Sequence, residues 1–143
     1  MATLNDRLRA GPIHPLHAVL LAGALPLFLG ALLSDMAYAK GFEIQWSNFA
    51  QWLLVGAMVF TGFALLWSLI EVVARRSRRR GWPLICFLLL AATFVLGLIN
   101  SFVHTRDAYG SMPEGLVLSA IVTLLAVVAT WVGFSSLRTG AAA

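Results

Sequence analysis

The sequence predicts an all-α integral membrane protein, a single domain over residues 1–143 that folds as an antiparallel four-helix bundle. Three observations lead to this fold class: four long apolar segments, few charged residues, and basic residues gathered at the ends of those segments. The chain is 60% hydrophobic and 11% charged, whereas a soluble domain carries about 25% charged residues. Each apolar segment has the roughly 20 residues that a helix needs to cross about 30 Å of hydrocarbon.

The four predicted membrane spans follow one another with short connections. They are expected over about residues 16–36, 49–74, 82–104 and 114–137. Pro15, Pro83 and Pro113 each fall in a predicted first turn, where the missing N–H of proline leaves no intrahelical bond unmade. The spans use most of the chain, so the sequence predicts one helical membrane domain and no separate soluble module.

Positive charge predicts the orientation of the spans. Half of the basic residues lie within 75–80, between the second and third spans, and others lie before the first span and after the fourth. Because basic connections stay on the cytoplasmic side, both termini and the connection 75–80 are expected in the cytoplasm. Residues 40–48 and 105–113 are then expected on the opposite face. The net charge of +4 therefore reflects topology, and nucleic acid is not an expected partner.

Small and polar residues recur inside the last three spans at alternating steps of four and three residues. A mean spacing of 3.5 residues is typical of the interface of a left-handed bundle, and membrane helices associate through small and hydrogen-bonding residues. The remaining positions are aliphatic or aromatic and suit contact with lipid. The predicted interior positions are Ala57, Thr61, Ala64, Ser68 and Glu71; Cys86, Leu90, Thr93, Gly97, Asn100 and His104; and Ser119, Thr123, Ala126, Thr130 and Gly133.

One group of polar residues gathers at the face opposite the termini. It consists of Asp35, Asn100, His104, Asp107 and Glu114. Asp35 and His104 end the first and third spans, and both are expected to face the interior, where each would be costly to leave unpaired. Three interpretations remain open: a structural ion pair, a proton relay or quinone-binding site, and a divalent metal site with carboxylate ligands from Asp107 and Glu114.

A second group lies at the face of the termini. His14 and His17 are three residues apart and share one face of the first helix, while Glu71 ends the second span. The expected arrangement has His14 capping the helix and His17 paired with Glu71; a metal or proton-transfer role is the alternative. Cofactors stay unknown, but haem b held by two histidines of one chain is disfavoured, because His104 lies a membrane thickness away from the other two.

These residues in this order resemble a known family. The set is His14-Pro15-Leu16-His17, Ser34-Asp35 and Asn100-x3-His104-x2-Asp107, followed by Gly115 and Ser119. It is similar to the bacterial predicted-membrane-protein family DUF2231, a domain of unknown function, over nearly the whole chain. The resemblance implies a multi-pass protein of the bacterial inner membrane. It also implies a place beside redox modules, because relatives occur next to or fused to Rieske domains and sugar dehydrogenases.

The sequence therefore predicts a small, non-enzymatic inner-membrane protein whose role is to anchor or assist a redox or dehydrogenase assembly. Its expected partners are the lipid bilayer and a separate redox subunit, and its oligomeric state stays open. The alternative is a membrane protein that handles a cofactor, a metal ion or protons through Asp35 and His104. No sequence motif names a substrate or a reaction.

Overall fold

A computed structural model describes residues 13–74, 81–106 and 110–140, with side chains described as far as Ser135. These residues form four helices: α2 (Pro15–Gly41), α3 (Ile44–Ala74), α4 (Gly81–His104) and α5 (Glu114–Gly140). All four are long and apolar enough to cross a membrane. The predicted fold class, an all-α helical membrane bundle, is confirmed.

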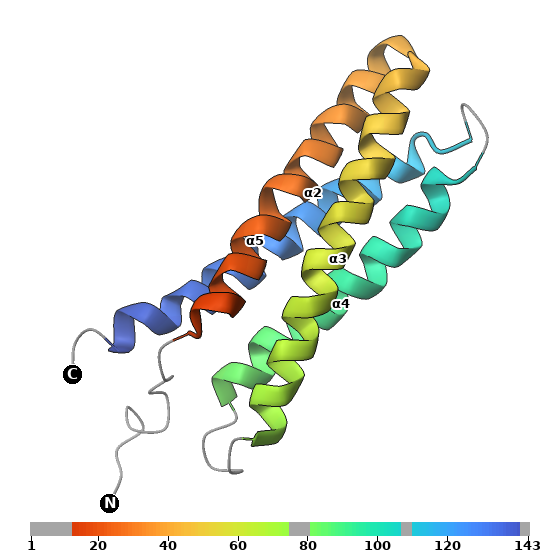
Figure 1. The fold of residues 1–143 in the computed structure, drawn as a ribbon. Helices are drawn as coiled ribbons and strands as arrows, with labels where there is room; N and C mark the ends of the chain where they lie inside the picture. Colours follow the sequence, from red (N-terminus) through yellow and green to blue (C-terminus); the bar gives the residue numbers. More distant parts are fainter. Residues whose placement is uncertain (1–12, 75–80, 107–109, 141–143) are drawn as a thin grey trace, which may run out of the picture.

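The helices run antiparallel in chain order and form a four-sided bundle (Figure 1). α2 packs against α3 and α5, and α4 packs against the same two helices. We call the end where α2 meets α3 and α4 meets α5 the connector end. The opposite end, where α2 begins and α5 finishes, is the terminal end. The basic residues of 75–80, on which the predicted orientation largely depends, lie outside the described residues.

The first connection is short, because α2 and α3 extend beyond the spans predicted over 16–36 and 49–74. The placement of residues 40–48 on the face opposite the termini stays a prediction. α2 continues to Gly41 and α3 already begins at Ile44. Phe42 ends α2 in the left-handed conformation (φ 51°), and its backbone N–H donates to the Tyr38 carbonyl at 2.7 Å. Phe42 and Glu43 together make the turn between the two helices, and the left-handed conformation of Phe42 ends α2 in the manner of a common C-cap.

The helix starts use the residues that the sequence singled out. The Nδ1 atom of His14 accepts a hydrogen bond from the Leu16 N–H at 3.2 Å, and Pro15 occupies the first turn of α2. This confirms the expected cap. At the same end of the bundle, Trp82 in the first turn of α4 donates from Nε1 to the Val132 carbonyl of α5 at 3.2 Å. That bond joins the two helices at the terminal end.

The interior agrees closely with the predicted spacing. Most of the predicted interior positions are buried, including Thr61, Ser68, Gly97, Asn100 and Ser119. Glu71 and Thr130 are the exceptions, since both are half-buried. An apolar layer fills the middle of the bundle, formed by Ala24, Phe28, Ala31, Leu54, Ala57, Val122 and Ala126. This layer separates two polar groups, one at each end.

Candidate functional site

Asp35 and His104 meet at the connector end. Asp35 lies on the last turns of α2 and His104 on the last turn of α4, and their side chains are 0% and 1% exposed. The Nε2 atom of His104 is 2.8 Å from Oδ1 of Asp35. The expected contact between these two residues is therefore present, whereas its role in function stays a prediction.

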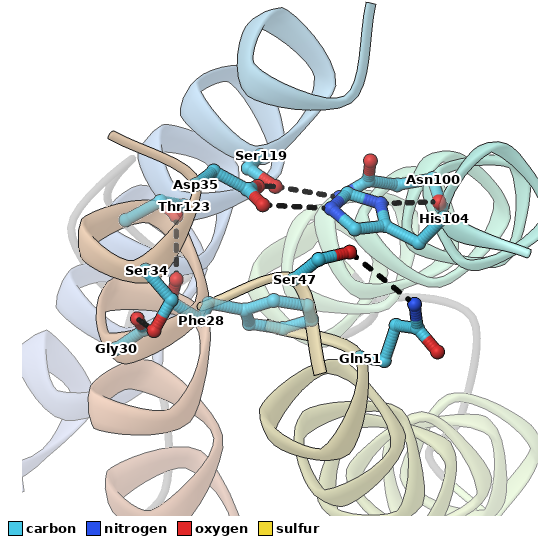
Figure 2. A network of polar contacts seen from close by, with 10 residues as sticks. All are labelled: Phe28, Gly30, Ser34, Asp35, Ser47, Gln51, Asn100, His104, Ser119 and Thr123. Atoms are coloured by element: carbon cyan, nitrogen blue, oxygen red, sulfur yellow. Dashed lines mark hydrogen bonds and ion pairs between the residues drawn. The ribbon is translucent and has the colours of Figure 1, made fainter. Parts of the chain in front are cut away.

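Two further side chains complete a buried network around this pair (Figure 2). The Ser119 hydroxyl of α5 donates to Oδ2 of Asp35 at 2.5 Å. Nδ2 of Asn100 in turn donates to the Ser119 oxygen at 2.8 Å. Asn100 is 0% and Ser119 1% exposed. We call Asp35, Asn100, His104 and Ser119 the connector network; it joins α2, α4 and α5.

The contact of Nδ1, the second ring nitrogen of His104, shows that this atom carries a hydrogen. Nδ1 lies 2.9 Å from the backbone oxygen of Asn100. A carbonyl oxygen only accepts hydrogen bonds, so Nδ1 carries a hydrogen. Between Nε2 of His104 and Oδ1 of Asp35, a hydrogen bond then needs one more proton, carried either by the imidazole or by the carboxyl group. The two residues thus share a single proton, and the pair as a whole is neutral in either form.

The donors in the network run in one direction. Asn100 donates to Ser119, and the single hydroxyl hydrogen of Ser119 is donated to Asp35. Turning the Asn100 amide over would remove this donor and leave an N–H group buried, so the network itself assigns the amide orientation. Oδ1 of Asn100 is left with no hydrogen-bond partner among the described residues.

Close packing holds the His104 ring in place. A Cβ atom added to Gly115 on α5 would lie 2.9 Å from Cε1 of His104. Glycine at this position lets the start of α5 approach the imidazole directly. Together with the two hydrogen bonds at the ring nitrogens, this contact leaves the ring one orientation.

The other predicted members of this site behave differently. Glu114 is exposed and accepts a hydrogen bond from Arg106 at 2.7 Å, instead of joining Asp35. Asp107 lies outside the described residues. Within the described ranges, no group of three or more His, Cys, Asp or Glu side chains is arranged to hold a metal ion.

At the terminal end, the expected contact between His17 and Glu71 is absent. Nε2 of His17 faces the Ser68 hydroxyl at 3.4 Å, and Ser68 lies 3.9 Å from the sulfur of Cys86. Glu71 instead accepts from Nε1 of Trp67 at 3.2 Å. Trp67 is one helical turn before Glu71 on the same face. The Glu71 carboxylate therefore forms its hydrogen bond with this donor on its own helix.

His14 and His17 therefore have separate surroundings. The His14 ring packs on Trp67 with 4.6 Å between ring centroids. His17 is 2% exposed, and its Nδ1 atom has no partner among the described residues. The terminal end thus holds His17, Ser68 and Cys86 through contacts that are longer than those of the connector network.

Ser119 is the functional candidate that sequence reasoning missed. It appeared as an interior position of the fourth span and among the residues of the family resemblance, but not among the site residues. The position of Ser119 in the sequence could have indicated its role. Gly115 and Ser119 are four residues apart and are the first inward positions of α5. They lie at the end of the bundle where Asp35 and His104 were expected. Ser68 and Cys86 were likewise seen only as interior positions.

Comparison with protein families identifies the class of protein that this fold and site define. A family model described as Predicted membrane protein (DUF2231) matches residues 13–138. The chain therefore belongs to this family, as the resemblance predicted. Comparisons with curated proteins and with solved structures found no match.

Proposed function

We propose that this membrane protein takes up and releases one proton at the Asp35–His104 pair. The observation that carries the proposal is the hydrogen-bond arrangement at His104. Nδ1 must donate to the Asn100 carbonyl, so one exchangeable proton lies between Nε2 and Asp35. Ionisable residues inside membrane spans commonly serve proton or ion pathways, and a carboxyl–imidazole pair can hold its proton on either partner.

Exchange is expected at the connector end alone. Asp35 follows His17 by 18 residues, which corresponds to about 27 Å along an α-helix. The hydroxyls of Thr61 and Thr93 between the two ends donate to carbonyls of their own helices, and that of Thr123 donates to the Phe28 carbonyl. These bonds form no chain from one end to the other, so the described interior supports a proton site and not a proton path across the bundle.

Infrared difference spectroscopy of the protein in lipid, recorded between two pH values, tests the proposal. The bands of the Asp35 carboxyl group should change with pH in the wild type and be missing in Asp35→Asn: the carboxylic-acid C=O stretch if the proton lies on Asp35, or the carboxylate stretches if it lies on His104. Glu114→Gln is the matched control, because it removes an exposed carboxylate and should leave the Asp35 band in place. Ser119→Ala keeps the pair but removes one hydrogen bond, so it should shift the frequency of the band. Identical spectra for the wild type and a folded Asp35→Asn variant would refute the proposal.

A second proposal concerns the setting in which this site works. We propose that the chain is an accessory or anchoring subunit of a redox or dehydrogenase assembly, supported by the implication of the family resemblance. Gentle extraction from native membranes, followed by mass spectrometry, should recover a separate redox protein with the wild type. Recovery of the chain without any redox protein would contradict this role, and the infrared result would be unaffected.

We further propose a bacterial inner-membrane location with both termini in the cytoplasm, supported by the placement of basic residues. Reporter fusions after Arg80 and after residue 143 should then give cytoplasmic signals, and fusions at Gly41 or Gly110 external ones. A cytoplasmic signal at Gly110 would contradict this orientation. Under it, the connector network faces the outer side of the membrane.

A further inference from the structure

A groove of about 470 Å³ lies between α4 and α5 at the connector end. Its walls are apolar side chains of both helices. Two oppositely charged residues, Arg106 and Glu114, lie at its end nearest the connection between the helices. The lining residues are Ile99, Val103, Arg106, Pro113, Glu114, Val117 and Leu118.

The polarity of the groove follows the direction of the helices. On α4, Val103 and Ile99 lie about one and two turns before Arg106, which follows the end of the helix. On α5, Val117 lies about one turn after Pro113, which directly precedes the helix. The apolar part of the groove therefore runs along the membrane spans toward the middle of the bundle, and the charged part of the groove lies at the ends of the spans. A molecule that fits this arrangement has a polar head at the membrane surface and a hydrocarbon tail below it.

The charged residues are well placed and accessible. Nη1 of Arg106 donates to Oε2 of Glu114 at 2.7 Å, and the side chains are 56% and 62% exposed. The Arg106 N–H bonds to the Val103 carbonyl at 3.2 Å, so the backbone of Arg106 stays attached to the end of α4. Glu114 begins α5, where a carboxylate is favoured by the helix dipole.

We propose that this groove binds a phospholipid with a zwitterionic, primary-ammonium headgroup, as in phosphatidylethanolamine. A guanidinium group forms paired hydrogen bonds with phosphate oxygens, and a carboxylate accepts from an ammonium group. Arg106 and Glu114 lie side by side, as do the phosphate and the ammonium of that headgroup. A choline headgroup has no N–H to donate, and a glycerol headgroup has no cation for Glu114.

A quinone is a poorer fit to the same residues. Its carbonyl oxygens need hydrogen-bond donors, and both ring nitrogens of His104 behind the groove already have partners within the protein. A neutral ring also makes no use of Glu114. The charges on the rim thus select a headgroup with both signs of charge.

The groove and the connector network share the same helical turns. Val103 precedes His104, and Leu118 precedes Ser119. In each of these turns, one residue lines the groove and the next residue in the sequence belongs to the connector network. A bound lipid would therefore pack against the outside of the turns that hold the proton site, although the lipid proposal does not depend on proton exchange.

Native mass spectrometry tests the proposal with equal amounts of phosphatidylethanolamine, phosphatidylcholine and phosphatidylglycerol. The wild type should retain the ethanolamine lipid better than the other two by up to about fivefold, the upper limit expected for one exposed charge pair. Glu114→Gln should abolish this preference and keep general binding. Arg106→Gln should weaken the binding of all three, because each carries a phosphate.

A pair of groove variants separates binding in the groove from general lipid contact. Val117→Trp should fill the groove and lower retention of every lipid, whereas Ile121→Trp, one turn further along α5 and outside the groove lining, should not. Equal retention of the three lipids by the wild type would overturn the proposal. An unchanged lipid preference in a folded Glu114→Gln variant would also overturn the proposal. The same holds if the wild type forms a dimer instead of binding lipid and Val117→Trp abolishes that dimer.

Discussion

The two ends of the bundle contain similar residues but organise them in different ways. Each end has a buried histidine and a serine that contacts it or its partner. At the connector end these groups are joined to the Asp35 carboxylate by hydrogen bonds of 2.5 and 2.8 Å. At the terminal end, the contacts of Ser68 with His17 and Cys86 are 3.4 and 3.9 Å long.

The position of the carboxylate explains the difference. Asp35 is on α2 with its side chain fully buried, and its partners among the described residues are interior groups of α4 and α5. Glu71 is half-buried near the end of α3 and has an N–H donor within its own helix, Trp67. In this protein the carboxylate that bonds to other helices organises a buried network, and the one that bonds within its own helix does not. Histidine alone does not produce such a network.

The largest expected difference between the ends is in the cost of losing the carboxylate. Asp35→Ala leaves His104 and Ser119 without their buried partner, and it should lower the free energy of unfolding by about 3–5 kcal/mol. Glu71→Ala removes one part-buried hydrogen bond and should cost about 1 kcal/mol. Reversible unfolding in mixed micelles, followed by circular dichroism, measures both. Equal losses would mean that the connector network does not hold the helices together.

Coupling between residues is the next contrast. Asp35→Asn and His104→Gln should act non-additively, with a coupling energy of up to about 3 kcal/mol, because each removes the other's partner. The control cycle of His17→Gln and Glu71→Gln should show coupling close to zero, since these residues make no hydrogen bond with each other in the structure. Unfolding of all six variants in the same micelles gives both values, and comparable coupling in the two cycles would contradict the described contacts.

Two serines provide a matched pair for a smaller effect. Ser119 and Ser68 are each 1% exposed, so both substitutions to alanine remove a buried hydroxyl. Ser119→Ala breaks hydrogen bonds to an ionisable partner and should cost about 1.5–3 kcal/mol, whereas Ser68→Ala should cost about 0.5–1 kcal/mol. The same unfolding measurement compares them. A larger loss for Ser68→Ala would reverse the ranking of the two ends.

The smallest expected effect concerns close packing. Gly115→Ala places a methyl group against the His104 ring, which two hydrogen bonds hold in place, and should cost about 1–2 kcal/mol. In Gly97→Ala the nearest atom would be the sulfur of Met58, at 2.6 Å, and a flexible thioether can move aside. Thermal stability in detergent should fall further for Gly115→Ala. If Gly97→Ala were the more harmful change, the ring of His104 would not be held as described.

Much of this fold could be predicted from the sequence because membrane spans obey few rules. Length and hydropathy give the helices, and the spacing of small residues gives their interior faces, so Thr61, Gly97 and Asn100 are buried as expected. The turn at Phe42 was not predicted, because a non-glycine residue in the left-handed conformation leaves no strong sequence signal.

The site was predictable only in part. Asp35 and His104 were matched because both must face the interior at the same end. The role of Ser119 depends on the rotation of α5 about its own axis. The spacing of residues along the helix does not fix this rotation accurately enough to predict a hydrogen bond. His17 and Glu71 do not pair as expected, because Glu71 accepts from the local donor Trp67 one turn earlier on α3.

The central claim is that Asp35 and His104 share one exchangeable proton, and nitrogen-15 NMR of labelled histidine tests it most directly. The chain has three histidines, so a His104→Gln spectrum assigns the signals of His104. The account predicts that Nδ1 of His104 stays protonated at every pH, while the Nε2 signal moves with pH and responds to Asp35→Asn. An Nε2 signal that does not change with pH, or a deprotonated Nδ1, would contradict it.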